Sequence, residues 1–96
     1  MPKKYPPLTP TEVRRILLAR GFTLIRTRGS HYTYQALLKG KKRSVTVDDH
    51  FPEYDDELLK NIVSQSGMDR EEFYGSTKET ARKIDLHAES YPIPLK

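Results

Sequence analysis

His31 is the residue of this sequence whose type and surroundings best suit acid–base chemistry. It follows Gly29 and Ser30, a pair typical of a tight turn, and Arg26 and Arg28 lie just before it. An imidazole exchanges protons near neutral pH, and a glycine allows a ligand to approach the backbone closely. RNA carries its own nucleophile, the 2′-hydroxyl, so one histidine beside arginines supplies part of what metal-free RNA cleavage needs. The same spacing is also typical of a surface histidine that only hydrogen-bonds within a turn, and both interpretations stay open.

Four more basic side chains gather at a second predicted turn, Lys39, Lys41, Lys42 and Arg43. At the tip of a hairpin they suit phosphate contacts, although a solvated turn has the same composition. Tyr32 and Tyr34, on the strand between the two turns, have the flat rings that stack on nucleic-acid bases. Tyrosines in strands more often pack in a sheet, so this pair is not placed among the candidate binding residues.

The other two histidines are weaker candidates for chemistry. His50 follows Asp48 and Asp49, and these three side chains could ligate a metal ion, but a loop-capping cluster is the commoner explanation. His87 lies in a tail and has no recognisable role. We therefore expect no metal among the site residues and no cofactor.

A well-marked helix precedes these residues, between Leu8 and Gly21. Thr9 and Glu12 have the spacing of a capping box, with Pro10 at the first helical position. Gly21 is a typical helix end. The spacing of the apolar residues in this segment predicts one apolar helix face that packs on the rest of the domain.

Three strands and a second helix follow, and they must position the candidate site. Alternating residues predict strands over 22–28, 31–38 and 43–47, with turns at 29–30 and 39–42. In the first strand Phe22, Leu24 and Arg26 are expected on one face; in the second, His31 is expected on the more polar face. A helix capped by Asp55 or Asp56 should run to Ser66, followed by a short helix with an Asp69–Glu72 capping box. This α-β-β-β-α order predicts an α+β fold, a three-stranded antiparallel sheet with both helices on one face, as in double-stranded-RNA-binding domains.

Composition narrows the class of protein and of partner. The chain has 96 residues, no cysteine and no apolar run of membrane-spanning length, which fits one small domain without disulfides and favours the cytoplasm. Residues 1–47 hold eleven Lys or Arg against one acid, a net charge of +10, whereas residues 48–96 hold six against twelve, a net charge of −6. The basic half suggests a polyanionic partner, most simply a nucleic acid.

Several motifs in this order resemble the HicA (YcfA-like) toxins of bacterial toxin–antitoxin systems. They are Leu8–Val13 and Arg20–Phe22 around the first helix, Gly29–His31, Val45–Val47 with His50 soon after, Ile62–Met68 and Glu71–Phe73. The resemblance covers about two-thirds of the chain. It implies the double-stranded-RNA-binding fold, an activity that cleaves mRNA, His31 as the catalytic residue, and a HicB-type antitoxin that binds the toxin and covers this site.

The expected function is therefore a toxin-type endoribonuclease without a metal. His31 would act as general base or acid, with Arg26, Arg28, Gly29, Ser30, Lys39, Lys41, Lys42 and Arg43 binding RNA. The expected organisation is an N-terminal arm at 1–7, a domain at 8–74 and an extension at 75–96 that is partly helical and then disordered.

Two departures from the family pattern keep other functions open. Asp48 stands where the family often has proline, and Asp55, Asp56 and Glu57 open the second helix, where the family usually has lysine and glycine. Three carboxylates there repel phosphates unless they serve only the helix dipole. A non-catalytic RNA-binding module of the same fold, or a protein-interaction module, are the alternatives.

Overall fold

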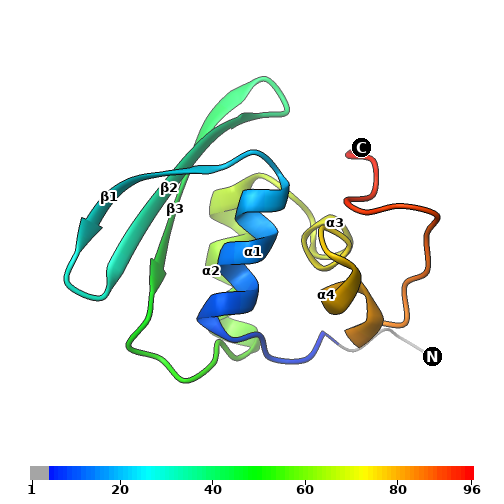
Figure 1. Ribbon diagram of the computed structural model, residues 1–96, viewed down its shortest axis with the longest axis horizontal. Helices are drawn as coiled ribbons and strands as arrows, with labels where there is room; N and C mark the ends of the chain where they lie inside the picture. Colours follow the sequence, from blue (N-terminus) through cyan, green and yellow to red (C-terminus); the bar gives the residue numbers. More distant parts are fainter. Residues whose placement is uncertain (1–4) are drawn as a thin grey trace.

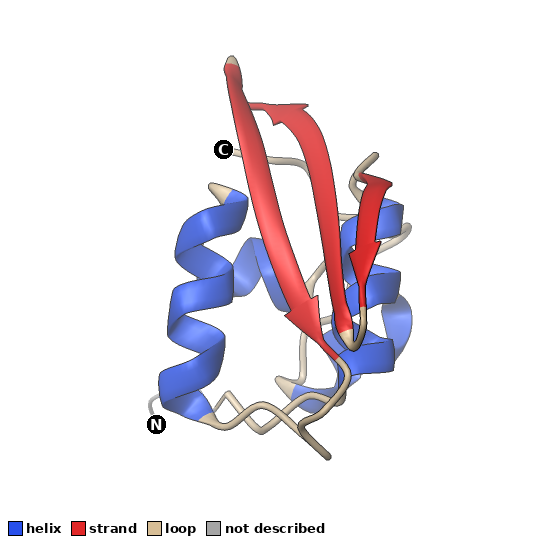
Figure 2. Cartoon of the chain, turned by 90° about the vertical axis from the view of Figure 1, so that its left-hand side faces the viewer, coloured by secondary structure: helices blue, strands red, loops and turns tan. Residues whose placement is uncertain are grey.

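A computed structural model describes residues 5–96 of the chain. Its elements, in chain order, are α1 (Pro10–Ala19), β1 (Thr23–Arg28), β2 (His31–Leu38), β3 (Lys41–Asp48), α2 (Asp56–Ser66), α3 (Arg70–Tyr74) and α4 (Lys78–Lys83). The strands form one antiparallel sheet in the order β1-β2-β3. The sheet lies on one side of the molecule and the helices on the other (Figure 1), and the outer face of the sheet stays uncovered (Figure 2). The predicted α+β fold of the double-stranded-RNA-binding type is confirmed.

The apolar faces of α1 and α2 pack against the inner face of the sheet. Val13, Ile16 and Leu17 of α1 are fully buried, and they meet Val45 and Val47 of β3 in one core. The predicted capping box is present: the Thr9 hydroxyl accepts from the backbone N–H of Glu12, and the Glu12 carboxylate accepts from the N–H of Thr9. These bonds satisfy backbone donors that the first turn of a helix leaves without partners.

The β2–β3 hairpin turns more tightly than the sequence predicts. Lys39 and Gly40 both have positive φ, 54° and 77°, as a two-residue hairpin turn with matching twist requires. β3 therefore begins at Lys41 rather than at Arg43, and the predicted four-residue turn at 39–42 is wrong. The tight turn sets the pairing register, which places His31 opposite Asp48.

A bulge in β1 changes which of its side chains share a face. Thr23 and Leu24 pair with Gln35 and Tyr34, but the next pair is Arg26 with Thr33, so Ile25 is an extra residue. The prediction that Leu24 and Arg26 lie on one face is wrong, because the extra residue turns Leu24 to the face opposite that of Arg26. Sequence alternation alone gives no sign of such a bulge.

The acidic start of α2 is explained within the fold. Asp55 is the N-cap and accepts from the N–H of Leu58, while Asp56 forms an ion pair with Arg70 at 2.8 Å. Carboxylates are also stabilised at the positive end of a helix. The second capping box, between Asp69 and Glu72, is present at the start of α3.

The segment after residue 74 is in contact with the rest of the molecule. Arg20, the C-cap of α1, donates to the carbonyl oxygens of Ile93 and Glu72, and the N–H of Ile93 donates to the carbonyl of Gly75. The division into an arm, a domain and an extension stays a prediction, and residues 1–4 of the arm lie outside the described residues. No helix of the described chain has the length and apolar character to cross a membrane.

Candidate functional site

The candidate site is a row of three side chains across the outer face of the sheet. His31 in β2 is paired with Arg28 of β1 on one side and with Asp48 of β3 on the other. Residues directly opposite each other in an antiparallel pair project to the same face. The next row that shares this face is Arg26, Thr33 and Thr46, so the two-residue turn at Gly29 and Ser30, which sets Arg28 opposite His31, brings both arginines to the side of His31.

Asp48 is fixed more firmly than its position at the end of a strand suggests. Its Oδ1 accepts from the Ser30 hydroxyl and from the backbone N–H of His50, both at 2.8 Å. The buried hydroxyl of Tyr54 accepts from the Asp48 N–H and donates to the Asp48 carbonyl. The N–H of His50 and the Ser30 hydroxyl lower the pKa of Asp48 below its ordinary value, with a smaller contribution from His31. The carboxylate is therefore ionised at neutral pH.

His31 lies next to this carboxylate and is open to solvent. Its Nε2 is 3.3 Å from Oδ2 of Asp48, and its side chain is 57% exposed. A carboxylate at Nε2 favours a proton on that nitrogen, which leaves the lone pair of Nδ1 free to accept a proton from a substrate. In other sites, too, a carboxylate orients a histidine in this way.

Arg26 and Arg28 are exposed and form no ion pair within residues 5–96. Their guanidinium groups can therefore meet a phosphate without first breaking a bond to a carboxylate. Planar guanidinium groups bind phosphate oxygens through two hydrogen bonds at once. The turn that leads to His31 is made by Gly29, with φ of 58°, and Ser30, whose hydroxyl is engaged with Asp48.

The second basic group does not join this row. Its residues begin beyond the far end of β2, which is about 23 Å from His31 at about 3.3 Å per strand residue. Lys39 bonds the buried carboxylate of Glu72 at 2.6 Å, and Arg43 donates to the carbonyl of Leu38 and packs against Gly67. These two side chains hold the hairpin to α3 and to the end of α2. Lys41 and Lys42 remain exposed at the hairpin tip.

The two strand tyrosines lie on the covered face of the sheet. Tyr34 is 4% exposed and belongs to the core, and the Tyr32 ring lies under the guanidinium of Arg14, 5.2 Å from its centroid. Neither ring is presented on the face that carries His31.

The remaining histidines lie apart from the row. His50 contributes its backbone N–H to Asp48 and places its ring near Phe51, and His87 contacts Asp85 in the tail. Within the described part of the chain, no three ligand-type side chains gather in a geometry suited to a metal ion.

The residue that sequence reasoning missed is Asp48. It had been read as a departure from the family pattern, whereas the structure makes it the partner of His31. The signal was available in the hairpin: a two-residue turn at Lys39-Gly40 pairs positions whose numbers sum to 79, and that register pairs His31 with Asp48. The predicted four-residue turn at 39–42 shifts the register by two residues, and in that register His31 is no longer opposite Asp48.

Comparison with known proteins adds one finding. A family model described as "HicA toxin of bacterial toxin-antitoxin" matches residues 10–68, from the first residue of α1 to the residue two beyond the end of α2. The match includes His31, Asp48 and both arginines. Searches of curated proteins and of solved structures gave no significant match.

Proposed function

The chain belongs to the HicA toxin family of bacterial toxin–antitoxin systems, and on this premise we propose that it is an endoribonuclease that cleaves mRNA on the outer face of its sheet. The observation that carries the proposal is the pairing of His31 with Asp48 beside two unpaired arginines. The catalytic domain spans residues 8–74, and the site of action is the cytoplasm, where mRNA is translated.

The proposed reaction uses the substrate's own 2′-hydroxyl as nucleophile. Nδ1 of His31 accepts the 2′-hydroxyl proton while the 2′-oxygen attacks the adjacent phosphorus. The bond from phosphorus to the 5′-oxygen breaks, and the 5′-oxygen takes up a proton from the imidazolium. The products are a 2′,3′-cyclic phosphate and a 5′-hydroxyl, so atoms and charge balance without a metal ion.

The arginines and the turn have separate parts in this proposal. Arg26 and Arg28 bind the phosphate and stabilise the charge that builds on its oxygens in the transition state. Gly29 shapes the turn, and Ser30 acts as a positioning residue through its bond to Asp48. Lys41 and Lys42 bind phosphates further along the strand, whereas the ion pair of Lys39 and the packing of Arg43 support the fold.

The family also implies an antitoxin partner. We propose a HicB-type protein that covers the outer face of the sheet and blocks access to His31. The face is basic and open, so an acidic surface on the partner is the matching chemistry.

The test compares two versions of one short RNA that the protein is found to cut, in the presence of EDTA. The second version carries a single 2′-deoxynucleotide on the 5′ side of the cleaved bond. We expect cleavage of the all-RNA strand to leave a 2′,3′-cyclic phosphate and the deoxy version to resist. A 3′-hydroxyl product, or equal cleavage of both strands, overturns the proposed chemistry. RNA binding with no cleavage at any protein concentration favours a non-catalytic binding module instead.

A further inference from the structure

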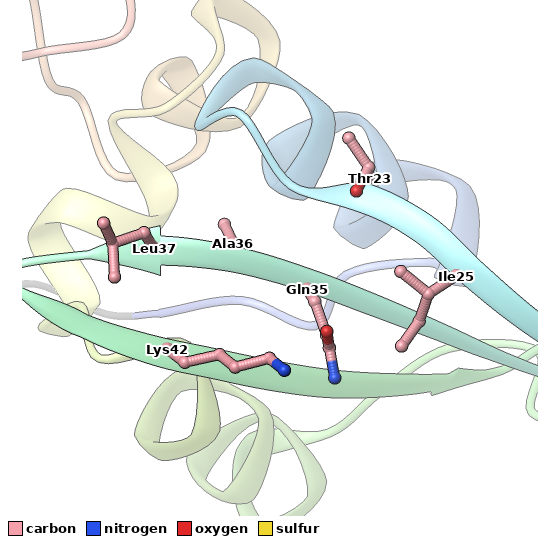
Figure 3. A pocket seen from close by; sticks show the side chains of 6 residues that line it. All are labelled: Thr23, Ile25, Gln35, Ala36, Leu37 and Lys42. Carbon is pink, nitrogen blue, oxygen red and sulfur yellow. The ribbon is translucent and has the colours of Figure 1, made fainter.

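A shallow pocket lies on the same outer face of the sheet, on the side of the bulge away from His31. It has a volume of about 370 Å³ and draws its lining from all three strands (Figure 3), Thr23 and Ile25 of β1, Gln35, Ala36 and Leu37 of β2, and Lys42 of β3. Apart from Lys42, proposed above as a phosphate contact, none of these residues has a part in the proposed reaction.

The floor of the pocket is apolar and unusually open to solvent. Leu37 is 78% exposed and Ile25 is 48% exposed, although the core of the molecule offers buried positions for side chains of this type. Ile25 is the extra residue of the bulge, directly before Arg26, and this irregularity places Ile25 in the pocket. The arginine and the apolar floor are thus neighbours along one strand.

The rim of the pocket is polar and carries positive charge. Gln35 offers an amide and Thr23 a hydroxyl, both able to bond the edge of a heterocycle, and Lys42 offers an ammonium group. Asp48 is the one acidic residue among the strand positions of the outer face, and it is engaged with Ser30 and His31. An apolar floor with hydrogen-bonding groups at its edge matches a nucleobase, which is flat and apolar on its faces and polar at its rim.

We propose that this pocket is a nucleobase subsite of the RNA-binding face, and this inference rests on the proposed function. Gln35 lies four residues along β2 from His31, about 13 Å, a span of about two nucleotides of extended single-stranded RNA. A strand whose phosphate is held by Arg26 and Arg28 at His31 therefore places a nearby base over Ile25 and Leu37. Gln35 reads the edge of that base, and Lys42 meets the phosphate beyond it.

Two features of the pocket favour RNA over a protein as its occupant. The pocket is continuous with the arginine row on the same strands and the same face. The cations at both ends of this track, Arg26 and Lys42, are free of ion pairs within residues 5–96, as a site for a polyanion requires.

The experiment measures binding of a uniformly 2′-O-methylated oligonucleotide, which the proposed reaction cannot cut, to the full chain. One abasic nucleotide is introduced at each position in turn. For the wild-type protein we expect one position at which loss of the base weakens binding by roughly tenfold, the effect of one stacked base. In Leu37→Ala the same abasic nucleotide should cost nothing, because the pocket floor is already lost. Gln35→Ala should reduce the preference among the four bases at that position.

Two substitutions elsewhere serve as controls. Leu18→Ala removes another exposed leucine, 57% exposed on α1, and Gln65→Ala removes an exposed glutamine of α2. Both should retain the tenfold penalty and the base preference. The inference is overturned if every abasic position costs the same in wild type and in Leu37→Ala, or if Leu37→Ala weakens an antitoxin complex and leaves RNA binding unchanged. Because binding is read without cleavage, these outcomes are distinct from failure of the proposed nuclease activity.

Discussion

At the scale of single residues, the site assigns different tasks to neighbouring polar groups. His31 is exposed, whereas the Asp48 carboxylate accepts from the Ser30 hydroxyl and from the His50 N–H, and the Tyr54 hydroxyl bonds the backbone of Asp48. A mobile proton carrier beside a fixed carboxylate is the arrangement that keeps one tautomer of histidine aimed at a substrate. The firmness of the carboxylate, rather than the exposure of the histidine, is what distinguishes this histidine from His50 and His87.

Asp48→Asn tests this assignment. The amide preserves the shape of the side chain and removes the charge that favours a proton on Nε2 of His31. We expect the rate of RNA cleavage to fall by roughly tenfold or more, with little change in the affinity for RNA. Asp85→Asn, at an exposed aspartate beside His87, should leave both quantities unchanged. Equal losses in rate and in affinity for Asp48→Asn would show that Asp48 supports the fold of the face rather than the histidine.

Much of this site could be predicted from residue types, but Asp48 follows only when the hairpin turn is placed at Lys39 and Gly40. His31, Arg26 and Arg28 stand close in sequence, so their common location follows from the chain itself. Asp48 is 17 positions away from His31, and its place depends on the length of one turn. For Lys39, residue type suggested phosphate binding. Its contact with the buried Glu72 is seen only in the tertiary structure.

At the scale of elements, helix ends could be predicted from the sequence where the capping residues lie within one helical turn of each other. Both capping boxes and the glycine end of α2 were visible in the sequence, because each involves residues three or four positions apart. The β1 bulge was not, since it depends on which residues of β2 are opposite. That bulge shapes the pocket on the outer face, because Ile25 is its extra residue and Thr23, on the other side of the shift, also lines the pocket.

The contact between the β2–β3 hairpin and α3 predicts how stability depends on pH. Burial alone would raise the pKa of Glu72, but Lys39 and the N–H groups of Asp69 and Lys96 lower it below its ordinary value overall. A carboxylate with a depressed pKa in the folded state stabilises the fold above its unfolded pKa. This stabilisation is lost as the pH falls through the folded-state value.

Glu72→Gln should therefore lower the free energy of unfolding by about 1–3 kcal/mol at pH 7, the cost of weakening a buried charged hydrogen-bond group. The difference from wild type should shrink below about pH 4, where Glu72 itself becomes protonated. Urea unfolding at several pH values measures this. The exposed loop variant Glu53→Gln serves as control and should track wild type throughout. A constant deficit at every pH would assign the effect to packing rather than to charge.

At the scale of the whole molecule, the outer face of the sheet has a net positive charge, although other basic residues of the first half of the chain, such as Arg14 and Arg15 of α1, lie on the helical side. The outer face of the sheet carries Arg26, Arg28 and Lys42, while most acidic residues belong to the loop after β3 and to the helical side. A positive face of this kind is what the proposed function requires, since it attracts a polyanion before any specific contact forms. The excess of basic residues in 1–47 was readable in the sequence, but the placement of three of them on one face of the sheet follows from the fold.

The salt dependence of RNA binding measures this polarity. Arg28→Ala should weaken binding and reduce the slope of log affinity against log salt by about one, because one phosphate contact is lost. Arg15→Ala, at an exposed arginine of α1 that pairs with Glu79, should change neither. Equal slopes for Arg28→Ala and wild type would mean that RNA does not cross the row of His31.

The central claim is that His31 carries the cleavage chemistry, and one comparison tests it most directly. Wild-type protein, His31→Ala and His50→Ala are incubated in EDTA with a mixed mRNA substrate, and cleavage rates are measured. General acid–base catalysis by one residue contributes about a hundredfold or more, so we expect His31→Ala to lose at least that much while still binding RNA. His50→Ala should cut like wild type, because its contribution to Asp48 comes from the backbone. Cleavage by His31→Ala at the wild-type rate would contradict the account.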